Sequence, residues 1–241
     1  ADPTKTSVLI IYIVSSTIFS LIPELVFAEE PITPIPLHTQ VDKKKAALGK
    51  LLFHDTRLSA NNTISCATCH PLNSAGMDGK RVSAGINGSL GIINTPTVFN
   101  SSLNLFQHWD GRAMTLEEQI DSPIHDPIEM GTDWPAIVKK LRQDNELNAL
   151  FKEIYRKEIS ATTIKDAIAT FERSLLTPNS RFDLFLRGET TAINQRERHG
   201  YKLFKSYGCS SCHQGVGVGG NMFEKMGVFR DYFSARGDIT S

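Results

Sequence analysis

Two short stretches decide how this chain folds: Cys66-Ala67-Thr68-Cys69-His70 and Cys209-Ser210-Ser211-Cys212-His213. Each stretch places two thiols one helical turn apart and follows the second thiol with a histidine. Thiols at this spacing can each form a thioether to one vinyl edge of the same porphyrin, and the adjacent imidazole can ligate its iron. The two stretches use all four cysteines of the chain. The sequence therefore predicts two covalently attached haem c groups, with His70 and His213 as the iron ligands.

Zinc binding, thiol redox exchange and disulfide formation fit the spacing of these cysteines less well. A zinc site built from two CxxC pairs is conceivable, but it does not require a histidine directly after each pair. A thioredoxin-like redox pair is typical of a βαβ setting and of one motif rather than two. Disulfides are common in exported chains with an even number of cysteines, yet haem attachment accounts for this spacing better.

The composition disfavours one broad class of function. The 241 residues include 26 Lys and Arg against 26 Asp and Glu, so the formal net charge is zero. A nucleic-acid-binding protein needs a basic surface, which this balance does not favour. The length is sufficient for one large domain or two small ones.

The first 28 residues have the pattern of a secretory signal peptide. Lys5 precedes an interrupted apolar run over 8–28, which ends in a small residue suited to a cleavage site. A membrane anchor is the alternative interpretation, but serines and Glu24 interrupt the run, and a membrane span needs ~20 apolar residues. We therefore expect residues 1–28 to be removed on export and the mature chain to be periplasmic.

Apolar spacing and capping residues predict helices over much of the remaining chain. A helix is expected over 42–53, and later apolar repeats each follow a residue that can cap a helix. These predicted caps or first turns begin at Thr115, Asp133, Thr163 and Asn194. Residues 71–94 show little apolar periodicity and are expected to form a long loop. No pattern indicates sustained strands, so the predicted fold class is mainly α with long loops.

We expect two domains, each built around one motif. The first covers 29–180 and the second covers 181–241, with 181–189 interpreted as a linker or domain junction. Phe182 and Phe185 within that stretch are interpreted as ordinary core residues.

Several further stretches accompany the two motifs in a specific order. They are LGKLLF at 48–53, NTPTVFN at 94–100, WDGRA at 109–113, PIEM at 127–130, and GGN at 219–221 with RGDIT at 236–240. Together with the CxxCH motifs, they resemble the bacterial dihaem cytochrome c peroxidases and their relatives, which include the methylamine dehydrogenase maturase. The resemblance runs from about residue 47 to the end of the sequence.

The resemblance implies two cytochrome c-like haem domains with different tasks. The N-terminal haem meets hydrogen peroxide, the C-terminal haem receives electrons from a small carrier such as cytochrome c or a copper protein, and a calcium ion lies between the domains. By matching position, the site residues are the distal acid/base Glu129, its pocket neighbour Gln119, the aromatic residue Trp109 between the haems, and the calcium ligand Asn94. Many family members form homodimers, which is an analogy only.

The residues themselves say less than the resemblance does. A carboxylate that moves a proton between the two peroxide oxygens is chemically suitable for cleaving the O–O bond. Glu129 lies in a polar loop next to Pro127, however, and a loop glutamate is most often a solvated surface charge. By the same standard, Trp109 alone indicates a core aromatic residue and Asn94 alone indicates a turn residue.

The sequence departs from the family pattern in the loop after the first motif. Many family members carry a histidine there that closes the resting peroxidatic haem, but the matching position holds Ile86, which cannot bind iron. We therefore predict that this loop leaves the first haem open to peroxide without prior reduction. His108 and His125 lie near the expected pocket elements and are alternative ligands, although each is more typical of a pocket or surface histidine.

The second departure lies at the C-terminus. Family members continue well past the RGDIT stretch, and that continuation carries the sixth ligand of the second haem, a Met in most members and a Tyr in the maturase branch. The sequence starts without an initiator Met and stops at Ser241, so we expect it to be incomplete at both ends. Met222 and Met226 are interpreted as packing residues rather than iron ligands.

Three functions remain in competition. The leading hypothesis is a peroxidase that reduces hydrogen peroxide to water with electrons from a reduced carrier protein. The second is a maturase-type oxidase that modifies a partner protein, with which Ile86 is compatible. The third is an electron-transfer cytochrome with no catalytic role, for which Glu129 is not needed.

Overall fold

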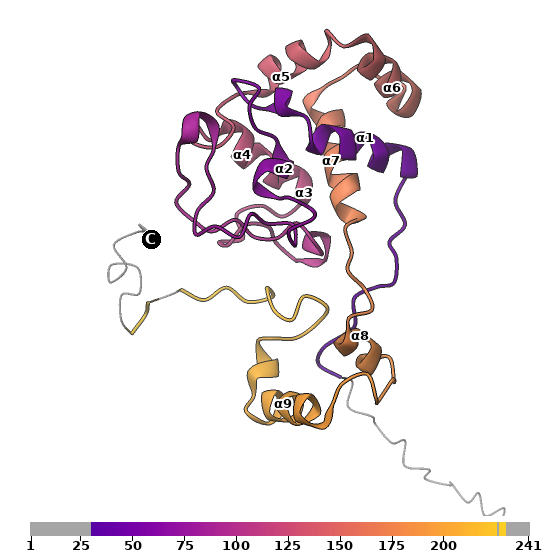
Figure 1. Cartoon of the computed structure of the whole chain (residues 1–241), viewed down its shortest axis with the longest axis vertical. Helices are drawn as coiled ribbons and strands as arrows, with labels where there is room; N and C mark the ends of the chain where they lie inside the picture. The colour runs from indigo at the N-terminus through magenta and orange to yellow at the C-terminus, as the bar shows by residue number, and fades with distance from the viewer. Residues whose placement is uncertain (1–29, 226, 230–241) are drawn as a thin grey trace, which may run out of the picture. The chain divides into compact units, whose positions relative to one another are not determined.

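The computed structural model describes residues 30–225 and 227–229 and is mostly helical there (Figure 1). These residues contain no strand, only the isolated bridges Ala84–Leu90 and Gln107–Ala113. The α-helices are α1 Lys43–Phe53, α2 Cys66–Cys69, α3 Leu116–Gln119, α4 Asp121–His125, α5 Trp134–Leu141, α6 Asn145–Tyr155, α7 Ala161–Arg173, α8 Arg181–Leu186 and α9 Gln195–Ser206. Short 3-10 helices are η1 Thr56–Leu58, η2 Ile86–Gly88, η3 Ser101–Leu103 and η4 Cys209–Ser211. The prediction of a mainly α fold is confirmed.

The crossing of α1 and α7 organises the first part of the chain. Gly49 lies where the helices meet, and a Cβ atom at this position would lie 1.9 Å from the carbonyl oxygen of Ala167. Only a residue without a side chain therefore permits this close approach. One turn further along α1, Phe53 packs edge-on against Phe171 with ring centroids 5.4 Å apart.

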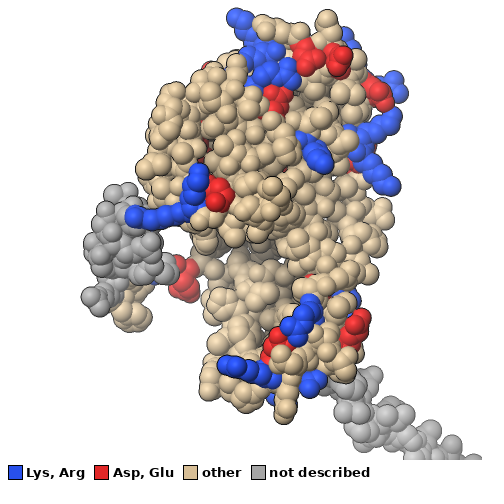
Figure 2. Space-filling model, in the orientation of Figure 1, with Lys and Arg blue, Asp and Glu red and all other residues tan. Residues whose placement is uncertain are grey.

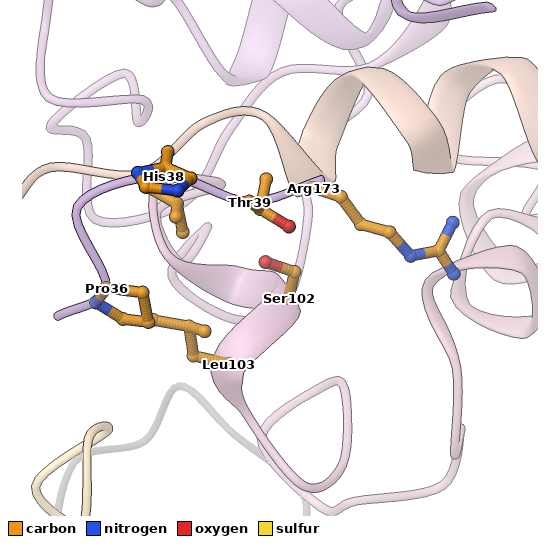
Figure 3. A pocket seen from close by; sticks show the side chains of 7 residues that line it. Pro36, His38, Thr39, Ser102, Leu103 and Arg173 are labelled. Carbon is orange, nitrogen blue, oxygen red and sulfur yellow. The ribbon is translucent and has the colours of Figure 1, made fainter. Parts of the chain in front are cut away.

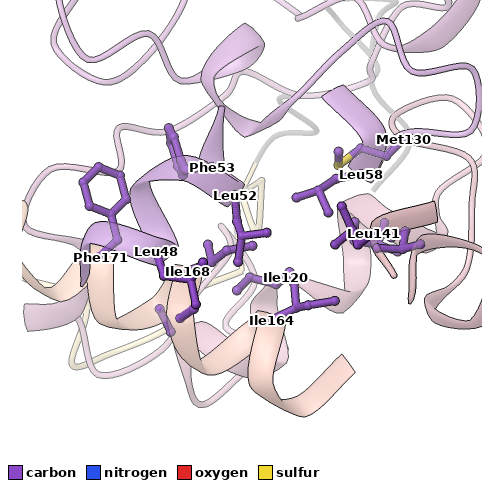
Figure 4. Packing of buried hydrophobic residues seen from close by; sticks show 14 of the residues in the cluster. Leu48, Leu52, Phe53, Leu58, Ile120, Met130, Leu141, Ile164, Ile168 and Phe171 are labelled. Carbon is purple, nitrogen blue, oxygen red and sulfur yellow. The ribbon is translucent and has the colours of Figure 1, made fainter. Parts of the chain in front are cut away.

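The hydrophobic core surrounds this crossing (Figure 4). Apolar residues on the inner faces of α1, α3, α4, α5, α6 and α7 meet there, as their helical spacing requires. The most completely buried large side chains include Leu48, Leu52, Phe53, Leu58, Ile124, Ile137, Leu141, Phe151, Ile159, Ile164 and Ile168. The core thus joins the helices that flank the first CxxCH motif into one packed body.

Several predicted helix starts are confirmed and one is displaced. The side chains of Asp42, Thr115, Asp133 and Asn194 accept hydrogen bonds from backbone amides at the starts of α1, α3, α5 and α9. Helix α7 begins at Ala161 rather than at Thr163, because Ser160 caps it. The Ser160 hydroxyl accepts from the Thr163 amide at 3.3 Å, and the Thr163 hydroxyl accepts from the Ser160 amide at 3.0 Å.

The first six residues of the stretch interpreted as a linker or domain junction, 181–189, form helix α8, so this part is not an irregular segment. Ser180 caps this helix by accepting from the Asp183 amide at 3.0 Å. Phe182 packs edge-on against Tyr201 of α9 with centroids 5.1 Å apart, and Asp183 accepts from the Ile35 amide at 2.8 Å. Capping and aromatic packing therefore order the first six residues of this stretch.

The described residues from Pro31 onward group into one compact unit. The division into domains at residue 180 stays a prediction. Residues 1–28, Met226 and the RGDIT stretch lie outside the described residues, so the predictions that concern them stay predictions. Within the described part of the chain, no helix is long and apolar enough to cross a membrane. Lys, Arg, Asp and Glu side chains intermingle on the face shown in Figure 2.

Candidate functional site

The first CxxCH motif forms a short helix set against the core. Cys66 and Cys69 are the first and last residues of α2, and the Ser65 amide donates to the Thr68 hydroxyl at 2.9 Å, which fixes the helix start. The His70 amide donates to the Cys66 carbonyl at 2.9 Å, so the histidine directly follows the turn. Both cysteines are free thiols and are half-buried.

The His70 ring is held as an iron ligand requires. Its Nδ1 lies 3.2 Å from the Gly76 carbonyl oxygen, which assigns the Nδ1 proton to that contact and leaves Nε2 for a metal. Burial lowers the pKa of His70, while the Gly76 and Pro96 carbonyls act in the opposite direction. The neutral imidazole, which is the ligating form, is therefore favoured at neutral pH. Burial also raises the pKa of the Cys66 thiol to about 12.

The second CxxCH motif repeats this geometry in a more open setting. Gly208, in the left-handed region at φ +78°, turns the chain from α9 into η4, and the His213 amide donates to the Cys209 carbonyl at 2.9 Å. Nδ1 of His213 lies 3.2 Å from the Val218 carbonyl oxygen. Cys209 and Cys212 are exposed free thiols.

Both motifs fit a covalently attached haem. Each presents two unbridged thiols one turn apart, and each histidine uses Nδ1 on a backbone carbonyl five or six residues later in the chain. A zinc site is not supported, because the described residues contain no group of three or more His, Cys, Asp or Glu side chains able to hold a metal ion. The residues present thus suit a porphyrin better than a protein-only metal site.

Glu129 lies in a turn that faces the first motif. Its amide donates to the Asp126 carbonyl at 3.1 Å, and its carbonyl accepts from the Ile86 amide at 2.8 Å. The carboxylate is close enough to Cys69 to raise the pKa of that thiol. Glu129 is exposed as a whole residue, but partial desolvation of its carboxyl, followed by the nearby Asp126, raises its pKa, and Arg112 opposes this shift. The structure therefore brings Glu129 to the first motif, with a carboxyl that holds its proton more tightly than a solvated one.

The loop that carries Ile86 packs tightly on the Glu129 turn. Ile86 is 7% exposed and belongs to the hydrophobic core, and its Cδ1 lies 2.4 Å from the position that a Cβ on Gly131 would occupy. Gly85 is equally close, since a Cβ there would lie 1.9 Å from the Ile128 carbonyl oxygen. Core packing of Ile86 thus fixes the loop against the turn that holds Glu129.

Gln119 and His108 form a second group of predicted pocket residues. Gln119 is the last residue of α3 and is half-buried, and its backbone carbonyl faces the His108 ring. Nε2 of His108 is buried and has no hydrogen-bond partner. Burial is the main cause that lowers the pKa of His108, and Arg112 adds to it. Arg112 therefore acts electrostatically on both His108 and Glu129, a connection that sequence reasoning missed. His125 ends α4 and is exposed.

Trp109 and Asn94 contact each other at the surface. The Trp109 indole donates to the Asn94 carbonyl at 2.9 Å, and 59% of Trp109 is exposed. The stretch after the second motif reaches the same loop: Phe223 packs on Phe106 with centroids 5.4 Å apart and covers Gly111. Trp109 thus lies in the loop where residues of the two motif regions meet. Met222 is 52% exposed.

The Asn94 side chain offers at most one oxygen to a calcium ion. Its nitrogen donates to the Lys80 carbonyl at 2.6 Å, which leaves Oδ1 as the available donor. Calcium takes six to eight oxygen ligands, so Asn94 by itself does not make a site. The described residues contain no group of three or more His, Cys, Asp or Glu side chains that could hold a metal ion with it.

None of the residues that line the surface pocket in Figure 3 belongs to either motif. The pocket is lined by Pro36, His38, Thr39, Ser102, Leu103, Arg173 and Leu176, and residues 36–39 face η3 across it. No residue of this lining was predicted as part of the site. Sequence reasoning also missed the neighbour of Arg173, Glu172, whose side chain is almost completely buried. Its burial depends on how the helices pack. The sequence Glu172-Arg173 within a helix does not predict that packing.

Comparison with known proteins gives a consistent result. The family model for "Di-haem cytochrome c peroxidase" matches residues 43–191. Over 204 residues the chain is 48% identical to the cytochrome c peroxidase Ccp of Escherichia coli, covering 84% of this chain and 44% of that protein. It is 45% identical to the cytochrome c551 peroxidase of Nitrosomonas europaea, covering 85% of this chain and 62% of that protein.

Among solved structures, a MauG-like protein associated with microbial copper homeostasis is similar, with a TM-score of 0.69 and 31% identity. That match covers 82% of this chain and 61% of the other. The chain therefore spans between 44% and 62% of the lengths of these relatives.

Proposed function

The chain belongs to the di-haem cytochrome c peroxidase family, and we propose that it reduces hydrogen peroxide to water with electrons from a small redox carrier protein. The single observation that carries this proposal is the position of Glu129, whose backbone carbonyl accepts from the amide of Ile86, in the loop that follows the first motif, at 2.8 Å. The relatives named as cytochrome c peroxidases support the same reaction.

Glu129 is the proposed acid and base. Reduction of peroxide needs a proton moved from the oxygen that stays to the oxygen that leaves, and a positioned carboxyl can carry it. The raised pKa of Glu129 is a shift in the direction that favours a carboxyl able to hold a proton and return it. When bound, the haem supplies the electron chemistry of the O–O bond cleavage. The backbone contact with Ile86 holds the Glu129 turn in place.

Electrons are proposed to enter through the second motif and to pass by Trp109. The exposure of Cys209 and Cys212 supports access for a carrier protein such as a cytochrome c or a copper protein. The contact of Phe223 with the loop that carries Trp109 supports a short path between the two regions. Two electrons and two protons convert each peroxide into two waters, so two one-electron carriers are oxidised per turnover.

Exchange of Glu129 tests the proposal. Glu129→Gln keeps the shape of the side chain but removes its ability to carry a proton, so peroxide turnover with a reduced cytochrome is expected to fall by about 10²–10⁴-fold. The control is Glu158→Gln, an exposed glutamate far from both motifs in sequence, which should leave turnover unchanged. Equal turnover in the native chain and Glu129→Gln would remove Glu129 from the mechanism. A haem-loaded protein with no turnover at all would favour an electron-transfer cytochrome.

A maturase-type oxidase that modifies a partner protein is the second candidate, because one similar structure is MauG-like. The residue that ligates the second haem opposite His213 distinguishes the two, with Met expected for a peroxidase and Tyr for the maturase type. Resonance Raman spectra of the haem-loaded protein identify that ligand.

We also propose that the first haem is open at rest. Ile86 cannot ligate iron, and its burial in the core supports a loop that stays in place. The oxidised protein should therefore show a high-spin ferric signal from the first haem in electron paramagnetic resonance. Bis-histidine low-spin signals from both haems would contradict this proposal. They would indicate that another histidine, such as His108 or His125, ligates the first haem.

The remaining proposals rest on the sequence pattern and the resemblance. They are export to the periplasm with removal of 1–28, two haem domains over 29–180 and 181–241, a homodimer, and a calcium ion that uses Oδ1 of Asn94. Calorimetric titration with Ca²⁺ of the native chain and of Asn94→Ala tests the last of these. Equal calcium affinity in both proteins would exclude Asn94 as a ligand.

A further inference from the structure

Glu172 is a buried acidic side chain that the proposed reaction does not use. It lies in the last turn of α7 and is only 5% exposed. Its Oε2 is buried and has no hydrogen-bond partner. Because a buried carboxylate without a partner is costly, such a group keeps its proton to a higher pH. Burial is accordingly the main cause that raises the pKa of Glu172 to about 8.

Three groups on the elements around Glu172 interact with it electrostatically. Glu117 of α3 raises its pKa, and Arg173 of α7 lowers it. These two are themselves paired, with Nη2 of Arg173 2.7 Å from Oε1 of Glu117. The third group is Cys66 of α2, whose pKa is raised by Glu172. Glu172 is therefore electrostatically coupled to one of the two residues that would tether the first haem.

We propose that Glu172 is a redox-linked proton acceptor for the first haem. It binds one proton from water when a one-electron donor reduces the iron, and it releases that proton when the iron is oxidised again. One electron and one proton enter together, so the net charge of this buried region stays constant. The inference rests on the proposed function, because it requires a haem tethered at Cys66.

The physical reason is the low dielectric around Glu172. Charges interact more strongly in the protein interior than in water, so the positive charge lost on reduction favours protonation of a nearby carboxylate. Attachment of a haem converts Cys66 into a thioether, which no longer titrates. Glu117 and Arg173 are paired and carry opposite charges, so Glu172 is left as the group of this cluster that takes up the proton.

The Glu117–Arg173 pair lies partly in solvent. Their side chains are 29% and 37% exposed, and Arg173 lines the surface pocket of Figure 3. Glu117 and Arg173 are the charged groups that shift the pKa of Glu172, so the proton bound at Glu172 is separate from the proton that Glu129 is proposed to move on peroxide.

The test is a redox titration of the haem-loaded chain, in which the midpoint potential of the first haem is measured between about pH 6 and pH 10. In the native chain, the potential should fall with rising pH over an interval around pH 8, approaching a tenfold change in electron affinity per pH unit, or about 59 mV for one electron. Glu172→Gln should remove that dependence, whereas Glu158→Gln should keep it. An equal slope in the native chain and Glu172→Gln would overturn the proposal.

A second variant keeps Glu172 itself in place. Glu117→Gln removes a neighbouring negative charge and frees Arg173, and both changes lower the pKa of Glu172. The pH range over which the midpoint potential of the first haem changes should therefore move to lower pH. Infrared difference spectra of the native chain should show a protonated carboxyl band that appears on reduction. In Glu117→Gln, the pH range over which this band appears should be lower, by the same amount as the range in the redox titration. A native chain without that band would contradict the proposal even if Glu172→Gln failed to fold.

These outcomes separate the inference from the proposed function. A protein with two haems and peroxide turnover, but with a pH-independent potential at the first haem, would contradict the role of Glu172 alone. A protein without haem at Cys66 and Cys69 would contradict both.

Discussion

The two CxxCH motifs have the same local geometry and very different surroundings. In both, Nδ1 of the histidine lies 3.2 Å from a backbone carbonyl oxygen. The cysteines of the first motif are half-buried beside the α1–α7 core, whereas those of the second are exposed after α9. The contrast teaches that one local motif can stand in very different surroundings, with different burial and neighbouring charges. Under the proposed function, the first region takes the reaction with peroxide and the second takes the contact with the electron donor.

The largest expected effect comes from removing one iron ligand at a time. His70→Ala should abolish the reaction with peroxide, because the first haem loses its only predicted protein ligand. His213→Ala should keep a single rapid reaction of the reduced protein with peroxide but lose steady turnover, because electrons no longer arrive. Stopped-flow spectroscopy separates the two phases. Loss of the rapid phase in both variants would show that the two regions do not have the separate tasks proposed for them.

A smaller effect is expected in the pH dependence of stability. Burial raises the pKa of Glu172 from 4.5 to about 8, so the folded state binds its proton more tightly than the unfolded state. The resulting stabilisation is full below about pH 4.5 and is lost as the pH rises through 8. The loss amounts to roughly 5 kcal/mol at 1.36 kcal/mol per pKa unit. Urea unfolding at several pH values measures it.

The matched control for this prediction is Glu172→Gln, which has no titrating group at that position. Its stability should vary less between pH 5 and pH 9 than that of the native chain, by roughly the amount given above. Parallel stability curves for the two proteins would show that Glu172 is not the group responsible.

The third prediction compares one glycine from each region. A Cβ at Gly49 would lie 1.9 Å from the Ala167 carbonyl oxygen, so Gly49→Ala should cost about 1–3 kcal/mol or more through overpacking. Gly200 lies in α9 with no atom within 4 Å of such a Cβ, so Gly200→Ala should stabilise the chain by about 0.5–1 kcal/mol. Thermal unfolding of both variants checks the opposite signs. Equal effects would mean that the two regions are packed alike.

Much of the site was predictable because its information is local. The spacing of cysteines and histidines lies within five residues, and the caps at Asp133 and Asn194 lie within one helical turn. The position of Glu129 beside the first motif was available only through resemblance, since a glutamate in a polar loop indicates a surface charge.

The rest depended on contacts between distant residues. Glu172 precedes Arg173 in a helix and has the sequence pattern of an exposed charge, yet packing of α3 and α7 buries it. Helix α8 is stabilised by Phe182 packing on Tyr201 of another helix, a contact that the six residues of α8 do not themselves predict. The unpartnered Nε2 of His108 likewise follows from folding rather than from local pattern.

The central claim is that haem is attached at both motifs. The most direct measurement is the intact mass of the chain produced in cells that attach haem c, together with peptide masses that locate each adduct. We predict two haem adducts, one on the peptide with Cys66 and Cys69 and one on the peptide with Cys209 and Cys212. A properly matured chain with one adduct or none would contradict the account.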